Sequence, residues 1–101
     1  MKLVDLDARF YGEGDRQGLG ILFECPVHPG GACMTGAPFA NPLDGGPPRP
    51  QPNGCAWQRT GTTIDTLTLS PSIDGSHHKG PDGTPCWHGH VTNGEIVGGL
   101  R

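Results

Sequence analysis

Residues 86–97 read CWHGHVTNGEIV, and this stretch combines the clearest strand pattern in the chain with its clearest turn. Apolar and polar side chains alternate over residues 86–91, as in a half-buried strand. The Asn93–Gly94 dipeptide that follows is the strongest short-range signal for a β-hairpin. We therefore predict a hairpin in which residues 95–97 form the returning strand.

Four further segments toward the N-terminus have the alternation or the β-branched content of strands. They are residues 2–10, 20–25, 56–60 and 64–70. Pro and Gly dominate residues 26–54, where five prolines fall between positions 42 and 52, so we expect a long surface loop that is richest in these residues at about 29–54. No window has a helical period. The sequence predicts an all-β fold, a small single domain over residues 1–101 with about five or six short antiparallel strands.

The composition predicts a thin core. The 101 residues include 18 Gly and 11 Pro but only 19 Leu, Ile, Val and Phe. A chain of this size buries only about two-thirds of its unfolded surface, and one with few large apolar residues usually needs a cross-link. The candidates are disulfides and a metal ion, since the chain holds four cysteines and five histidines.

Several classes of protein are excluded by what the sequence lacks. No apolar run approaches the roughly 20 residues of a membrane span. The start, MKLVDLDARF, has acidic residues where a signal peptide has its apolar stretch, so we expect no secretion by that route and a reducing compartment that disfavours disulfides. The net charge is −3 and the seven Lys and Arg are scattered, which argues against a nucleic-acid partner.

Two short Cys/His pairs predict a zinc site. Cys25 and His28 are separated by two residues at the end of a predicted strand, a spacing that lets one turn aim both ligands at one ion. Cys86 and His88 are two positions apart and would project from the same face of a strand. We predict one tetrahedral zinc held by these four residues, with His90 as the substitute if His88 is not a ligand. Metal-binding free energy would then become folding free energy.

The remaining cysteines and histidines leave alternatives open. Cys33 and Cys55 lie at either end of the Pro-rich loop and could pair, or could complete a different four-ligand set with Cys25 and Cys86. We expect instead that both are free buried thiols, because cysteine often acts as a small hydrophobic residue. We expect His77 and His78, in a polar turn, to be exposed to solvent.

The two tryptophans, Trp57 and Trp87, are expected to pack in the core beneath the metal site, because they hold much of the apolar area of the chain. An enzyme would need an open position on the zinc and a general base. Glu24 and Glu95 are the candidates for that base, but no motif supports either role. Ser70 and Ser72 lack the glycine frame of a serine hydrolase.

The order of motifs resembles a family of small proteins carried mainly by tailed bacteriophages and prophages. The matching pieces are C-P-x-[CH] at Cys25–His28, W-x3-G at Trp57–Gly61, T-L-S-P-S-I at Thr68–Ile73 and C-W-H-G-x-V-T-N-G-E at Cys86–Glu95. They span most of residues 23–97, and His28 stands where many members have Cys. Some members carry the label ammonia monooxygenase, but no copper-oxygenase pattern is present here. The resemblance implies a phage origin and a zinc-ribbon-like, metal-binding β domain, and it implies no activity.

Three functions remain open from the sequence. The first is a non-enzymatic phage structural or accessory protein, docked on a capsid or tail by its extended loop. The second is a zinc-ribbon-like module that binds a host or defence protein inside the infected cell. The third and least favoured is a zinc-dependent hydrolase. The expected location is accordingly the virion or the host cytoplasm, and the expected partners are other phage structural proteins or a host protein.

Overall fold

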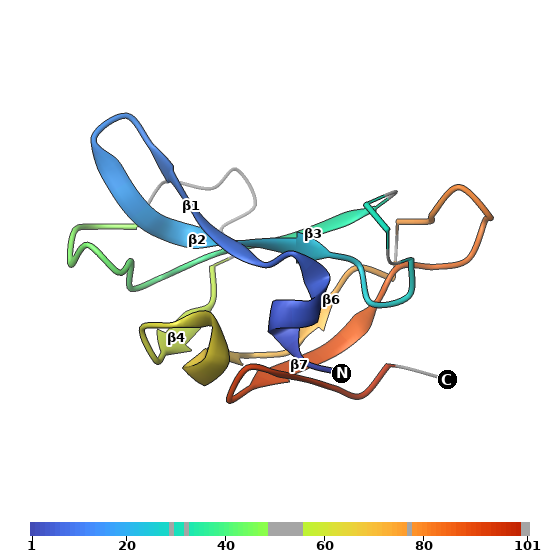
Figure 1. Ribbon diagram of the computed structural model, residues 1–101. Coiled ribbons are helices and arrows are strands. Elements are labelled where there is room, and N and C mark those ends of the chain that lie inside the picture. The colour runs from blue at the N-terminus through green and yellow to red at the C-terminus, as the bar shows by residue number, and fades with distance from the viewer. Residues whose placement is uncertain (29, 32, 49–55, 77, 100–101) are drawn as a thin grey trace.

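The computed structural model describes residues 1–28, 30–31, 33–48, 56–76 and 78–99. In these residues the chain forms eight strands and two short 3-10 helices, so the predicted all-β class is confirmed with more strands than expected. The strands form three small antiparallel sheets in the orders β1-β2-β3, β4-β5 and β6-β7-β8. Figure 1 shows β1, β2 and β3 crossing above the strands of the other two sheets. The elements are η1 (Leu3–Leu6), β1 (Arg9–Glu13), β2 (Arg16–Glu24), β3 (Met34–Pro38), β4 (Gln58–Thr60), η2 (Ile64–Thr66), β5 (Thr68–Ser70), β6 (Ile73–Asp74), β7 (His88–Thr92) and β8 (Glu95–Val97).

β2 is the longest strand and lies at the centre of its sheet. Its alternation buries Ile21 and Phe23 on one face, and Cys25 continues the same row just beyond the end of the strand. β3 pairs with β2 in a register that places Glu24 opposite Met34. The end of this pair therefore carries Cys25 toward the core.

The predicted hairpin near the C-terminus is confirmed as β7 and β8. Asn93 and Gly94 have φ values of 48° and 72°, the left-handed conformation that a two-residue hairpin turn requires at both positions. Val91 on β7 is fully buried, whereas His88 and His90 are exposed. The strand begins at His88 rather than at the predicted residue 86.

Two predicted strands begin instead as 3-10 helices, which corrects the expectation for residues 2–10 and 64–70. Leu3 and Leu6 are both buried in η1, and in a 3-10 turn residues three apart lie one above the other. In η2 a reciprocal capping contact between Thr63 and Thr66 holds the turn. Apolar residues spaced by three fit this geometry as well as they fit part of a strand.

The expected loop over residues 26–54 contains a strand that the sequence analysis missed. β3 has only one buried residue, Ala37, and Met34 is exposed, so no alternation of large apolar residues identifies it. Its position is fixed by hydrogen bonding to β2, whose start at Arg16 also lies earlier than the predicted residue 20. The structure describes this loop only in part, because residues 29, 32 and 49–54 lie outside the described ranges.

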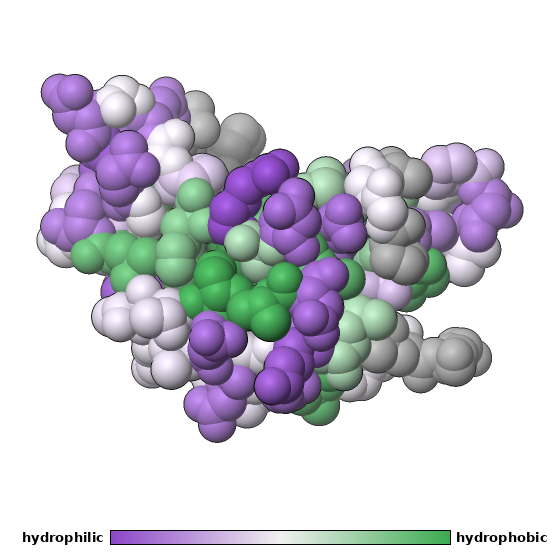
Figure 2. Space-filling view, in the orientation of Figure 1, coloured by the Kyte–Doolittle hydropathy of each residue, from purple (hydrophilic) through white to green (hydrophobic). Residues whose placement is uncertain are grey.

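One cluster of buried side chains joins all three sheets and η1. Phe23 and Trp87 meet in it edge to face, with ring centroids 6.1 Å apart. In Figure 2 hydrophobic residues gather at the middle of the molecule, while the hairpins that project on either side are mostly hydrophilic. On the face shown, the hydrophobic surface is therefore central, and the projecting hairpins add little to it. Among the described residues, no helix is long and apolar enough to cross a membrane.

The segments on either side of residues 49–55 are tied together. Asn41 donates to the carbonyl of Arg59 at 2.8 Å and accepts from the Arg59 amide at 2.8 Å. The Arg59 guanidinium also donates to the carbonyls of Asn41 and Gly61 and lies over the ring of Phe39. This arrangement holds the chain at both ends of that stretch.

Candidate metal centre

The first half of the centre is a tight turn at the end of β2. After Glu24 the chain turns at Pro26, and the His28 amide donates to the Cys25 carbonyl at 3.0 Å. This turn brings Nδ1 of His28 to 3.6 Å from Sγ of Cys25. Cys25 is 1% exposed and His28 is 8% exposed, so both ligand groups are removed from solvent.

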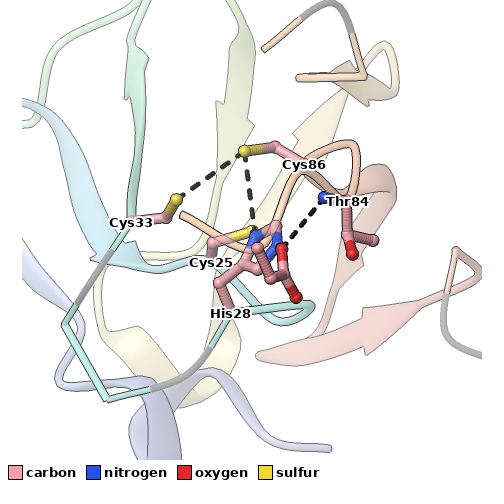
Figure 3. A network of polar contacts seen from close by, with 6 residues as sticks. Cys25, His28, Cys33, Thr84 and Cys86 are labelled. Atoms are coloured by element: carbon pink, nitrogen blue, oxygen red, sulfur yellow. Dashed lines mark hydrogen bonds and ion pairs between the residues drawn. The ribbon is translucent and has the colours of Figure 1, made fainter. Parts of the chain in front are cut away.

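The second half follows a small hairpin over residues 79–85. Lys79 and Pro85 form its bridge, and the Cys86 amide donates to the carbonyl of His78 at 2.9 Å. Cys86 lies just before β7, and its Sγ is 3.9 Å from Nδ1 of His28. Figure 3 shows the side chains of Cys25, His28 and Cys86 pointing toward one another from these two segments.

The donor atoms of Cys25, His28 and Cys86 all lie within 4.8 Å of one another, so the three residues could hold a metal ion. In a tetrahedral zinc site with ordinary bond lengths, a sulfur and a nitrogen ligand lie about 3.6 Å apart and two sulfurs about 3.8 Å apart. The two distances from Nδ1 of His28 to the sulfurs, 3.6 Å and 3.9 Å, are close to these ligand-to-ligand distances. The donor types and these two distances are therefore compatible with a bound metal ion.

The pKa values of the Cys25 and Cys86 thiols shift in opposite directions. Burial raises the pKa of Cys25, but hydrogen bonds from the Trp87 amide, the His28 ring and the amides of Val27 and His28 outweigh it, so the pKa falls below its usual value. Burial raises the pKa of Cys86 to about 11, and the neighbouring Cys33 and Cys25 thiols add to this. Two thiolates cannot share so small a space without a compensating cation. A divalent ion would supply that charge.

Asp82 contacts Nε2 of His28, the ring nitrogen on the side away from the sulfurs. Its Oδ1 lies 3.0 Å from Nε2 of His28 and accepts the Thr84 amide at 2.9 Å. The hydrogen bond from the Thr84 amide has the largest effect on the pKa of Asp82 and, with the contact to His28, lowers it. Hydrogen bonds to Cys25 and to Asp82 raise the pKa of His28. With an ion bound at Nδ1, the remaining ring proton would lie on Nε2 and be shared with Asp82. This is the outer carboxylate contact that metal-binding histidines commonly make.

The structure does not bring His88, the fourth predicted ligand, into this group. His88 lies in β7 opposite Asp74, and its Nδ1 is 3.9 Å from the Asp74 carboxylate. Its side chain is 55% exposed. The prediction assumed that Cys86 and His88 share one face of a strand, but Cys86 precedes the strand and turns toward Cys25. His90, the predicted substitute, is exposed on the same side of β7 as His88.

Cys33 contacts one member of the group. Its Sγ is 3.9 Å from Sγ of Cys86, and the dashed line in Figure 3 marks this contact. Cys25, Cys33 and Cys86 are free thiols, as expected for Cys33, although its side chain is only partly buried. Cys55 and His77 lie outside the described residues, and His78 is exposed as predicted.

The tryptophans divide between two places. Trp87 is 1% exposed and follows Cys86 directly, with its indole nitrogen donating to the Gly98 carbonyl at 2.9 Å, so it packs beside the centre as predicted. Trp57 is partly buried against the core, and its indole donates to the Ser72 carbonyl. Its backbone is bridged to Phe39 rather than to the metal segments.

Glu24 and Glu95, the two candidates for a general base, make their contacts away from the sulfur atoms of the candidate centre. Glu24 and Phe23 lie on opposite faces of β2, and the Glu24 carboxylate accepts from the Gly30 amide. The Glu95 carboxylate lies 3.9 Å from the N-terminal ammonium. An open groove of about 1020 Å³ runs beside Cys86 and His88. Of the three residues of the candidate centre, the groove is lined by Cys86.

Asp82 is the residue beside the candidate centre that the sequence analysis missed. In the sequence, Asp82 stands only in a Gly-containing turn, Asp82-Gly83-Thr84, shortly before Cys86. A carboxylate in a turn is too common to indicate a partner of a metal-binding histidine.

Comparisons of the chain with known protein families, with curated proteins and with solved structures give no match.

Proposed function

We propose that this protein is a small β domain stabilised by a structural zinc ion, and that it acts as a non-enzymatic structural or accessory component of a tailed bacteriophage. The observation that carries the zinc proposal is the convergence of Cys25, His28 and Cys86. Their donor atoms lie within 4.8 Å of one another although Cys86 and His28 are 58 residues apart in the chain.

A structural role for the ion follows from what it would hold. Residues 81–85, which lead into Cys86, are all exposed and contribute nothing to the apolar core. Contacts with His28 anchor this hairpin, through Asp82 and through Cys86. An ion bound at the centre would fix the hairpin to the end of β2 and restrict the unfolded chain over a long loop.

The phage role rests on the sequence motifs together with this architecture. The motifs C-P-x-H, S-P-S-I and C-W-H-G-H-V-T-N-G-E resemble those of small tailed-phage proteins. The chain is weakly acidic and its loops are rich in Pro and Gly, which suits an extended surface laid against a protein partner rather than nucleic acid.

The zinc proposal is tested by elemental analysis of the full chain purified without added metal. We expect one zinc per chain, and a chelator should release it with loss of thermal stability. A chain that holds no metal and keeps its melting temperature in chelator would overturn the proposal.

The phage role is tested by quantitative mass spectrometry of virions from a phage that encodes the protein. A structural component should be present at a fixed number of copies per particle after gradient purification. If purified particles lack it while infected-cell lysate contains it, the protein acts inside the cell, and affinity capture from infected cells should then identify its partner.

A further inference from the structure

The fourth ligand of the proposed zinc site can be sought from the strand register. β2 and β3 pair Phe23 with Thr35 and Glu24 with Met34. The Cys25 amide donates to the Cys33 carbonyl at 3.0 Å, which continues the register by one pair. Cys25 and Cys33 therefore lie opposite each other at the end of the sheet.

Opposite residues of an antiparallel pair project from the same face, with Cβ atoms about 4.5–5.5 Å apart. That face is the buried one, because Cys25 continues the row of Ile21 and Phe23. Cys33 must then point to the side on which Cys86 approaches. The distance of 3.9 Å between Sγ of Cys33 and Sγ of Cys86 agrees with this placement.

We propose that Cys33 is the fourth ligand, so that Cys25, His28, Cys33 and Cys86 form a closed Cys3His zinc site; this inference rests on the proposed structural zinc. The separation of the Cys33 and Cys86 sulfurs is close to the edge of about 3.8 Å between two thiolates on one zinc. Cys33 is not among the three residues whose donors all lie within 4.8 Å of one another. The proposal therefore requires a change of the Cys33 side-chain rotamer that brings its sulfur toward Cys25 and His28.

The same register argument excludes His88 as that ligand. His88 is paired with Asp74, and both side chains are 55% exposed on the side of the sheet away from Val91 and the core. Binding zinc through His88 would require β7 to rotate and withdraw Val91 from the core. Binding through Cys33 requires a movement of its side chain.

A closed site has a chemical consequence. Structural zinc sites have four protein ligands, whereas catalytic sites keep one position for water or substrate. With Cys33 bound, the ion has no position from which to activate water. The groove beside Cys86 would then offer a substrate no open position on the ion.

The test compares Cys33→Ser with His88→Gln in the full chain, each loaded with Zn²⁺ or with Co²⁺ as a spectroscopic replacement. For Cys33→Ser we expect Zn²⁺ affinity to fall by more than the about 10- to 100-fold that loss of an outer-shell partner costs. Its Co²⁺ spectrum should lose one-third of the thiolate-to-metal charge-transfer intensity. His88→Gln should match the wild type in both measurements.

The opposite pattern, with His88→Gln weakened and Cys33→Ser unchanged, would overturn the inference in favour of His88. Equal affinities for both variants, with a wild-type Co²⁺ spectrum of two thiolates, would overturn it in favour of water as the fourth ligand. A wild-type chain that binds no metal would refute the proposed function itself and not only this ligand.

A second measurement covers the case in which Cys33→Ser does not fold. The wild-type chain is treated with iodoacetamide with and without bound zinc, and the modified cysteines are located by mass spectrometry. We expect zinc to protect Cys33 together with Cys25 and Cys86. Alkylation of Cys33 at the same rate with and without zinc would exclude it as a ligand.

Discussion

Nε2 of His28 lies 3.0 Å from Oδ1 of Asp82, and this contact joins two turns that are 54 residues apart in the chain. Asp82 is held in turn by the Thr84 amide, so the carboxylate is fixed before any ion arrives. His28 is thereby oriented with Nδ1 toward Cys25 and Cys86. A preset ligand lowers the entropy cost of binding an ion.

Asp82→Asn should weaken zinc binding without unfolding the chain. The amide keeps the shape and can still accept from Thr84, but it loses the negative charge beside His28. We expect the dissociation constant for zinc to rise about 10- to 100-fold, measured by competition with a chromophoric chelator. Asp74→Asn is the matched control, because Asp74 lies beside the exposed His88, and it should leave the dissociation constant unchanged. Equal effects of the two substitutions would contradict a specific role for Asp82.

Gly80→Ala should disturb the centre through the position of the His28 ring. An added Cβ at Gly80 would lie 2.6 Å from both Cδ2 and Cε1 of that ring, closer than carbon atoms approach. The ring or the hairpin must then move, at a cost of about 1–3 kcal/mol. We expect both a lower melting temperature and weaker zinc binding, by thermal denaturation and chelator competition.

Gly36→Ala is the control for Gly80→Ala. An added Cβ at Gly36 meets only Leu22, at an ordinary contact distance of 3.6 Å. This variant should behave as the wild type toward zinc. The role assigned to Gly80 is wrong if its alanine variant binds zinc as tightly as the Gly36 variant does.

Cys86→Ser should release zinc and remove the stabilisation that the ion gives. A ligand at a thousandfold excess over its dissociation constant stabilises the folded state by about 4 kcal/mol. For a chain of about 100 residues this corresponds to a fall of about 20 °C in melting temperature. Calorimetry with and without chelator measures it, and the chelator should lower the wild-type melting temperature but not that of the variant. Zinc retained by Cys86→Ser at the wild-type melting temperature would remove Cys86 from the site.

The clearest pH dependence away from the metal centre is expected at Asp44. Its carboxylate accepts two hydrogen bonds from the Arg16 guanidinium, at 2.9 Å and 3.0 Å. These bonds, with the Gly46 amide, lower the pKa of Asp44 from 3.8 to about 2. Because the folded-state pKa is the lower one, the stabilisation is complete above about pH 4 and is lost as the pH falls toward 2.

An NMR titration of the Asp44 carboxyl group should show this low midpoint, and Arg16→Gln should move the midpoint toward the ordinary value of an aspartate. In chemical denaturation, the difference in stability between the wild type and Asp44→Asn should shrink between pH 4 and pH 2. A difference that stays constant over this range would show that the ion pair does not contribute to folding.

The sequence was sufficient to predict the fold class and three of the proposed ligands because these depend on local patterns. The Asn93–Gly94 turn needs left-handed backbone at two adjacent positions, which its residues favour. The C-x2-H spacing of Cys25 and His28 is likewise a property of one turn. Such features can be recognised without knowing what lies across the sheet.

The rest of the site depends on contacts between distant segments, which no local pattern encodes. Cys33 lies opposite Cys25 only because β3 pairs with β2, and β3 has almost no apolar alternation of its own. His88 was predicted to join Cys86 because strand periodicity was extended two residues too far toward the N-terminus. Asp82 meets His28 through a turn-to-turn contact that the sequence does not indicate.

The hydrogen bonds between Asn41 and Arg59 join two parts of the chain that are 18 residues apart. Because these two residues fix the chain on both sides of residues 49–55, the distance that the intervening segment must span is set by the folded strands and not by the segment itself. The spacing of the chain at Asn41 and Arg59 is therefore set by hydrogen bonds between described residues, and the ligand-bearing turns lie outside the stretch that this cross-link closes.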